Sequence, residues 1–206
     1  MKICINEKEY ESGNITREKY RKFREVFEGL LGKDKDKQTF TDEDLDNMLD
    51  VIVAVYENQF SIDEANEALD EVPDILLNFS LINAEVLNKL NIQAEDMAKN
   101  LNTNKINING ITYESGKIGR KKYSKFRKVY DETVKPEKQT YTDEDLDRML
   151  EAIVIVYDEQ FTLEEANKSL NDVSEIIFKF AMINANIIKK LSEQAEDVKK
   201  NLSSRK

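Results

Sequence analysis

The strongest constraint on the fold is an internal repeat. The stretch TDEDLDNML at residues 41–49 returns as TDEDLDRML at residues 142–150. Over residues 39–101 and 140–202, roughly half of the aligned positions are identical, which is more than a shared helical bias produces. The chain is therefore interpreted as a tandem duplication of one structural unit of about 100 residues, a common size for a domain.

The repeated stretch predicts a helix with a marked start. Thr41 and Thr142 suit the N-cap position, because a hydroxyl can accept from the unpaired N–H groups of the first turn. The acidic residues that follow suit the positive end of the helix dipole. Apolar residues at helical spacing then predict the central helix of each repeat. They are Leu45, Met48, Leu49, Ile52, Val53, Tyr56 and Phe60 in the first copy and Leu146, Met149, Leu150, Ile153, Val154, Tyr157 and Phe161 in the second.

Each copy opens with a predicted β-hairpin and a basic helix. Asn109-Gly110 between alternating residues is a strong hairpin signal, whereas Glu7 takes the glycine position in the first copy, which leaves open whether its turn is the same. Ser61 and Thr162 begin capping boxes that open a short helix. The fold class is therefore mainly α, with two homologous α-helical lobes, each preceded by a short β-hairpin (β-β-α-α-α-α).

A long helix is expected to begin near Val72 and near Val173. Loops of different length, at residues 32–37 and 135–138, separate the basic helix from the central helix. We expect the first unit over residues 1–101, the second over 105–206, and a linker at 102–104. The core stripe expected for the long helices consists of Ile75, Leu76, Phe79, Ile82, Val86, Leu87 and Leu90, and of Ile176, Ile177, Phe180, Ile183, Ile187, Ile188 and Leu191.

Composition excludes several functions. The 206 residues include no histidine and one cysteine, Cys4, so neither an internal disulfide nor a usual nucleophile–base pair is expected. The formal net charge of −10 argues against general nucleic-acid binding, which depends on releasing counterions from phosphates. No apolar run approaches the length of a membrane span, and the N-terminus does not have the pattern of a signal peptide. We expect a non-enzymatic protein with no cofactor and no membrane segment.

The acidic stretch has the spacing of a partial calcium loop. Asp42, Asp44 and Asp46 match the first ligand positions of an EF-hand. Asn47 occupies the glycine position, and Val53 occupies the position of the closing glutamate. Helix capping explains the acidic residues without a metal, so we expect none.

Two groups of residues are candidates for binding a partner. Four aromatic residues occur at the same place in both copies, and core packing is the alternative explanation for them. Two asparagines interrupt the apolar stripes of the long helices, where a buried amide needs a hydrogen-bond partner in the bundle or at an interface. The candidates are Tyr56, Phe60, Asn83, Tyr157, Phe161 and Asn184.

Three motifs in this order resemble the tail assembly chaperones of long-tailed bacteriophages that infect Gram-positive bacteria. They are a strand–turn–strand of the type Lys-Ile-x-Ile-Asn-Gly, a Tyr-x-x-Phe helix, and a Thr-x-x-Asp-Leu-Asp-x-Met helix that ends in Tyr-x-x-Gln-Phe. The residues that carry the resemblance are Ile106–Glu114, Tyr123–Phe126 and Tyr141–Phe161, with Ile3–Glu11, Tyr20–Phe23 and Phe40–Phe60 in the first copy.

The resemblance implies a transient assembly factor. Such chaperones bind the phage tape-measure protein and promote assembly of the tail tube protein around it, in the cytoplasm of the infected or lysogenic bacterial host and outside the mature virion. They are usually single units, so the fused pair leaves self-association open, and a longer frameshifted form is also left open. The alternative is a phage-encoded regulatory protein that binds a host protein, for example a defence protein, because a fold does not fix one function.

Overall fold

The computed structural model describes residues 1–31, 40–99, 105–135, 138 and 140–203. Side chains are described for residues 1–30, 40–90, 105–135, 138 and 140–189. The expected linker and the expected loop at 32–37 lie outside the described residues. The chain divides into two compact units, Met1–Asn91 with Asn171–Ser174, and Ile92–Leu170 with Glu175–Lys206.

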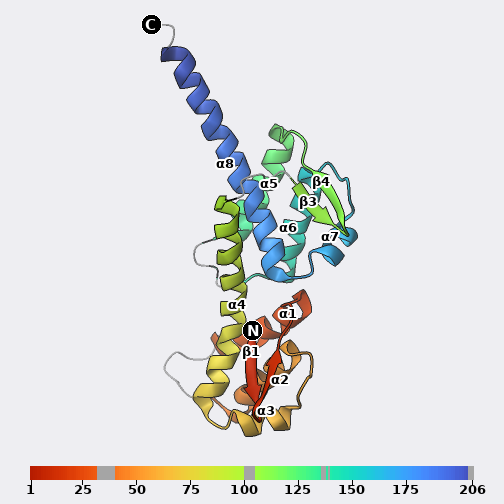
Figure 1. Cartoon of the computed structure of the whole chain (residues 1–206), viewed down its shortest axis with the longest axis vertical. Helices are drawn as coiled ribbons and strands as arrows, with labels where there is room; N and C mark the ends of the chain where they lie inside the picture. Colours follow the sequence, from red (N-terminus) through yellow and green to blue (C-terminus); the bar gives the residue numbers. More distant parts are fainter. Residues whose placement is uncertain (32–39, 100–104, 136–137, 139, 204–206) are drawn as a thin grey trace. The chain divides into compact units, whose positions relative to one another are not determined.

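The order of elements confirms the predicted fold class. Two short strands precede four helices, and the same order then recurs (Figure 1). The elements are β1 (Lys2–Ile5), β2 (Lys8–Glu11), α1 (Arg17–Leu31), α2 (Asp42–Val55), α3 (Ile62–Ala68), α4 (Val72–Lys99), β3 (Lys105–Ile108), β4 (Ile111–Glu114), α5 (Arg120–Thr133), α6 (Asp143–Val156), α7 (Leu163–Ser169) and α8 (Val173–Ser203).

Both hairpins are antiparallel and use the same turn. Asn6 and Glu7 have φ angles of 50° and 64°, and Asn109 and Gly110 have φ angles of 52° and 82°. Two consecutive left-handed residues match the twist of the flanking strands, as in type I′ turns. The first hairpin therefore keeps this turn without a glycine, and Glu7 adopts the left-handed conformation at the steric cost that its Cβ imposes.

The central helices begin where the sequence predicts and end earlier. The hydroxyls of Thr41 and Thr142 accept from the backbone N–H groups of Asp44 and Asp145, and the two carboxylates accept from the caps in return. The expected helix continued to Phe60, but α2 ends at Val55 and α6 ends at Val156. The cause is a pair of left-handed residues just beyond each end, at 57–58 and 158–159, which a right-handed helix cannot contain.

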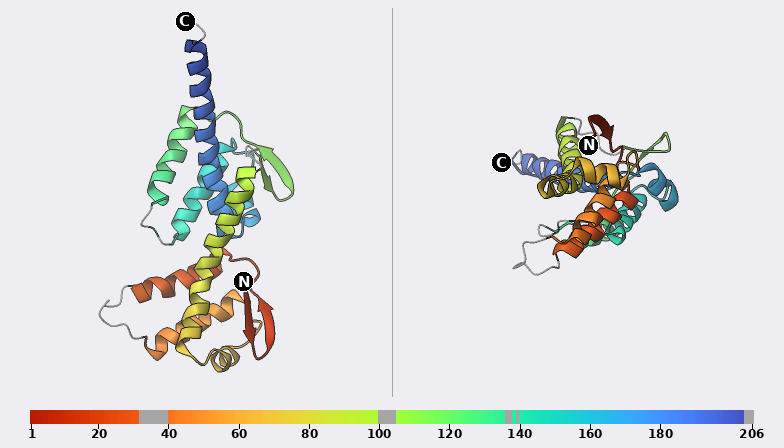
Figure 2. Two further views of the ribbon diagram at one scale, coloured as in Figure 1. Left: turned by 60° about the vertical axis from the view of Figure 1, so that its left-hand side comes forward. Right: turned by 90° about the horizontal axis from the view of Figure 1, so that it is seen from below.

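Each core is built around a central helix and its neighbours. Figure 2 shows that α1 and α2, and likewise α5 and α6, run in opposite directions. Aromatic contacts join the basic helices to the long helices, with 4.9 Å between the ring centroids of Phe23 and Phe79 and 4.7 Å between those of Phe126 and Phe180. These rings are buried, so the basic helices are held by their apolar faces and turn their charges outward.

The buried face of the long helices is narrower than the sequence predicted. Ile75, Phe79 and Ile82 are buried as expected. Leu87 and Ile188 were expected in the core, but they are 49% and 55% exposed. Each directly follows a buried residue and is rotated from it by about 100° around the helix axis. No helix in the described part of the chain is long and apolar enough to cross a membrane.

Candidate functional site

The aromatic candidates of the first repeat hold the hairpin against the central helix. The ring of Phe60 lies 5.1 Å from Tyr10 on β2 and 5.7 Å from Tyr56 at the end of α2. The side-chain amide of Gln59 donates to the carbonyl oxygen of Glu11 at 2.8 Å. A lone hairpin is marginally stable in water, so these contacts account for its attachment.

The second repeat uses the same contacts. Phe161 lies 5.1 Å from Tyr113 and 5.8 Å from Tyr157, and Gln160 donates to the carbonyl oxygen of Glu114 at 2.9 Å. All four candidate rings are at most 4% exposed. Burial raises the pKa of Tyr157 to about 12. Burial also raises the pKa of Tyr56 to about 12, and the charge of Glu85 makes a smaller contribution to that rise. Burial agrees with the core-packing explanation, and partner binding by these rings stays a prediction.

A lysine from each basic helix fixes the left-handed turn. Lys19 donates to Glu57 at 2.9 Å, and Lys122 contacts Asp158 at 2.5 Å. A glycine lies beside each carboxylate, and a Cβ added to Gly116 would lie only 2.6 Å from an oxygen of Asp158. The sequence marked the glycines as hairpin exits but did not indicate these lysines, because the partners lie 38 and 36 positions apart.

A second apolar stripe lies on α4, opposite its buried face. We call Leu77, Leu81, Ala84 and Leu87 the outer stripe of α4, and they follow one another at spacings of four, three and three residues. Leu77 is 56% exposed, Leu81 40% and Leu87 49%. At about 100° per residue these side chains share one side of the helix. In the described part of the chain, α4 therefore presents large apolar side chains to solvent as well as to the core.

The equivalent positions of α8 are apolar too. Phe178, Met182, Ala185 and Ile188 form the outer stripe of α8. Ile188 is 55% exposed, and the other three are intermediate in exposure. An exposed leucine alone needs no explanation, but an apolar stripe at matched positions of two helices does.

The asparagine candidates border these stripes. Asn83 is half-buried and lies one turn before Leu87 on the same side of α4. Asn184 is half-buried and lies one turn before Ile188 on the same side of α8. The structure thus places both asparagines beside exposed apolar residues.

Most residues of the outer stripes were missed by the sequence argument. The core stripe was assigned from apolar residues at helical spacing. A helix with two apolar sides contains two series of apolar residues at that spacing, so spacing alone does not identify the buried one. The available signal was the persistence of apolar side chains at non-core positions in both repeats, as at Leu77 and Phe178.

The acidic positions serve as helix caps. Asp44 and Asp145 are 6% and 8% exposed, and each accepts from both the backbone and the hydroxyl of its threonine. Burial tends to raise the pKa of Asp145, but hydrogen bonds from Lys138 and Thr142 outweigh it and lower the pKa overall. Among the described residues, no group of three His, Cys, Asp or Glu side chains is arranged to hold a metal ion.

Comparison with known proteins identifies the family of the chain. A family model described as phage tail chaperone protein matches residues 2–106, just over half of the chain. The chain belongs to this family of phage tail chaperones. No curated protein and no solved structure matches it.

Proposed function

We propose that the chain is a tail assembly chaperone that binds the phage tape-measure protein through the outer stripes of α4 and α8. The observation that carries the proposal is an apolar stripe at matched positions of both long helices, exposed at Leu77, Leu81 and Leu87 on α4 and at Ile188 on α8. The proposal also takes residues 1–101 and 105–206 as two chaperone units that work in the cytoplasm of the host cell and are absent from the virion.

The spacing of the outer stripe suits a helical partner. Side chains three and four residues apart form ridges that fit between those of a second helix. An amphipathic helix of the tape-measure protein would lay its apolar side over Leu77, Leu81 and Leu87, which is a common mode of helix recognition. The apolar residues of the tape-measure protein would then be covered and could not contact those of another copy, so its aggregation would be suppressed.

The expected affinity is moderate. Fully burying a leucine side chain contributes about 1.5–3 kcal/mol, and half-exposed residues contribute less. Association and side-chain ordering offset much of the total. A complex of this strength can release the tape-measure protein when tail tube subunits arrive, and the net charge of −10 would keep the complex soluble.

Co-expression with the tape-measure protein tests the proposal. The stripe variant carries Leu77→Gln, Leu81→Gln, Leu87→Gln and Ile188→Gln. All four side chains are exposed in the free protein, so helicity and melting temperature should remain close to wild type. We expect the amount of tape-measure protein that is soluble and co-purifies with the variant to fall by about tenfold, as the loss of about 1.4 kcal/mol implies.

A matched control replaces four exposed apolar residues away from the outer stripes. It carries Ile62→Gln, Val72→Gln, Ile111→Gln and Leu163→Gln, and it should co-purify as much tape-measure protein as the wild type. Equal recovery with the stripe variant would contradict the assignment of the binding surface. Failure of the wild type itself to recover the tape-measure protein would contradict the proposed function.

A further inference from the structure

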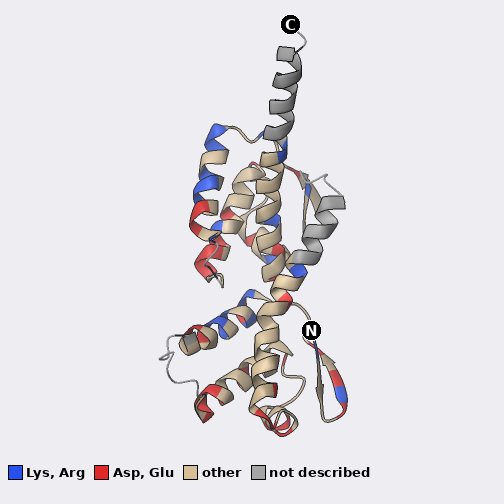
Figure 3. Ribbon diagram, turned by 90° about the vertical axis from the view of Figure 1, so that its left-hand side faces the viewer, with Lys and Arg blue, Asp and Glu red and all other residues tan. Residues whose placement is uncertain are grey.

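Helix α5 presents a strongly basic surface on an acidic protein. Its 14 residues include six lysines and arginines against one aspartate and one glutamate. We call the exposed cations of α5 the basic face. They are Arg120, Lys121, Lys125, Arg127 and Lys128. Figure 3 shows these cations along the N-terminal part of the helix and acidic residues at its C-terminal end.

The equivalent helix of the first repeat has no comparable surface. Helix α1 carries five cations against three acids. Glu18 and Glu25 occupy the positions of Lys121 and Lys128, and the guanidinium of Arg24 lies 3.9 Å from the carboxylate of Glu28. The four side chains at these two exchanged positions are all exposed, so the exchanges alter the surface charge of the helix.

The basic face opposes the stability of its own helix. The first turn of α5 holds three cations and no acid, at the positive end of the helix dipole. Its N-cap, Gly119, makes no side-chain hydrogen bond. By contrast, α2, α3, α6 and α7 each begin with a capping box and acidic residues. Helix stability therefore does not account for the cations of α5.

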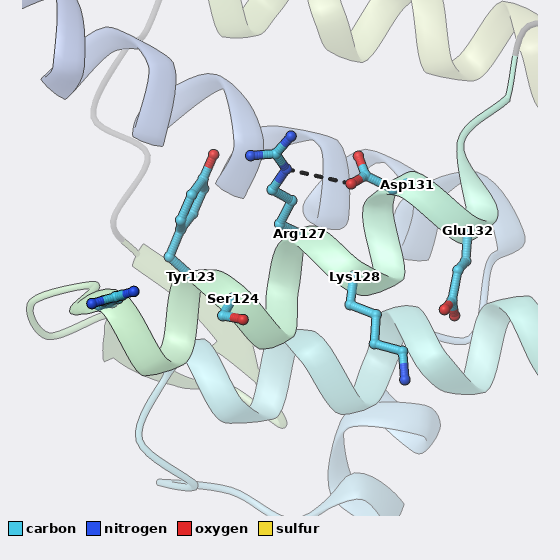
Figure 4. A pocket seen from close by; sticks show the side chains of 7 residues that line it. Tyr123, Ser124, Arg127, Lys128, Asp131 and Glu132 are labelled. Carbon is cyan, nitrogen blue, oxygen red and sulfur yellow. Dashed lines mark hydrogen bonds and ion pairs between the residues drawn. The ribbon is translucent and has the colours of Figure 1, made fainter.

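A hollow of about 540 Å³ lies along α5, and three cations of the basic face, Arg120, Arg127 and Lys128, line it (Figure 4). Tyr123 lines it between Arg120 and Arg127, and Ser124 adds a hydroxyl. Tyr123 is half-buried, whereas the equivalent Tyr20 is 2% exposed. The second repeat thus offers an aromatic ring beside cations, which together can bind a segment with both an apolar and an anionic side chain.

The acidic end of α5 limits what can bind. Asp131 lies 3.3 Å from Arg127, and Glu132 is joined to Arg148, which also binds Glu144. A nucleic acid is negative along its whole length, so it would meet these carboxylates after the basic face. A protein segment can instead be acidic over one half and basic over the other, which matches the order of charges along α5.

We propose that the basic face of α5 binds a helical protein segment that is acidic where it meets Arg120, Arg127 and Lys128 and basic where it meets Asp131 and Glu132. An apolar side chain of the segment would contact Tyr123. This surface is separate from the outer stripes, and it gives the second repeat a partner that the first repeat does not bind.

Peptide binding tests the proposal directly. The probe is a fluorescein-labelled helical peptide of about 16 residues, long enough to span α5, with glutamates in one half, lysines in the other and a central leucine. The comparison probes are a peptide of the same composition with alternating charges and a single-stranded oligothymidine of similar length. We expect the block peptide to bind the full chain most tightly in fluorescence anisotropy.

Two variants with equal net charge distinguish binding at the basic face from attraction that depends only on the net charge of the protein. Arg120→Glu, Arg127→Glu and Lys128→Glu together should weaken binding of the block peptide by about tenfold, given three exposed charge contacts. The control, with Lys8→Glu, Lys22→Glu and Lys168→Glu at exposed positions elsewhere, should change it less than twofold.

Three outcomes would overturn the inference. They are equal losses in the two triple variants, oligothymidine binding as tight as that of the block peptide, and no binding of the block peptide by the wild type. None of these measurements involves the tape-measure protein or the outer stripes, so the result is independent of the test of the proposed function.

Discussion

Individual apolar positions of the central helices behave as their spacing predicts. Met48, Ile52, Met149 and Ile153 are at most 1% exposed, because a series at helical spacing places side chains on one side of a helix. The long helices are harder to predict, because a second apolar series is present there. The sequence contains both series but not the information about which one the rest of the chain covers.

Ile153 provides a sharp test of the core. Its side chain is fully buried, so Ile153→Asp would place an unpaired charge in an apolar environment and should reduce the free energy of unfolding by about 4 kcal/mol or more. The matched control is Ile188→Asp, which changes the same residue type at a position 55% exposed and should cost less than about 0.5 kcal/mol. Urea denaturation followed by circular dichroism measures both, and equal midpoints for the two variants would contradict the core assignment.

Tyr56 makes stability depend on alkaline pH. Burial raises its pKa to about 12, whereas the unfolded chain ionises near 10. The unfolded state therefore loses this proton first, and the stability that the neutral phenol contributes is lost as pH rises from about 10 to 12. For this tyrosine alone we expect a loss of about 1 kcal/mol by pH 11.

The variant Tyr56→Phe isolates that effect. Among the described side chains, the hydroxyl of Tyr56 is buried without a hydrogen-bond partner, so its removal should leave the stability at pH 7 unchanged or higher. The difference between wild type and variant should grow in favour of the variant between pH 9 and pH 11 in urea titrations. A constant difference over this range would show that Tyr56 ionises normally in the fold.

At the scale of elements, helix starts are predictable and helix ends are less so. A start is set by local chemistry, as Thr142 and Asp145 show with reciprocal hydrogen bonds. The ends of α2 and α6 depend on left-handed residues that are not glycine. Glu57 and Glu159 carry no sequence signal for that conformation, and Asn58 and Asp158 carry only a weak one. Contacts of the turns with Lys19 and Lys122 help to hold it.

The left-handed turn after α6 predicts substitutions of opposite sign. Glu159 has a φ of 56° and is exposed. Glu159→Gly relieves the steric cost of a Cβ in this conformation and should raise the free energy of unfolding by about 0.5–1 kcal/mol. Glu151→Gly, at an exposed position inside α6, should lower it by about 1 kcal/mol. Thermal melts of both variants measure the effect, and a loss of stability in Glu159→Gly would show that the turn is not strained.

At the scale of the whole molecule, the sequence predicted the class of protein and the order of its elements. Its repeat and its motifs were sufficient because both are carried by local patterns. The candidate surfaces were not predicted, since exposure of Leu77 or Lys121 depends on which sides of α4 and α5 the rest of each unit covers. The net charge of −10 gave no indication of the basic face, because a net charge contains no information about where positive and negative side chains lie on the surface.

If the outer stripes bind a client as proposed, the presence of two of them on one polypeptide would affect how that client is released. A client long enough to contact both stripes meets the second at an effective concentration on the order of millimolar once the first has bound. Such avidity makes dissociation of the whole complex slow while each single contact stays weak. An incoming tail subunit could then displace one stripe at a time, and it would compete at each step with only a fraction of the total affinity.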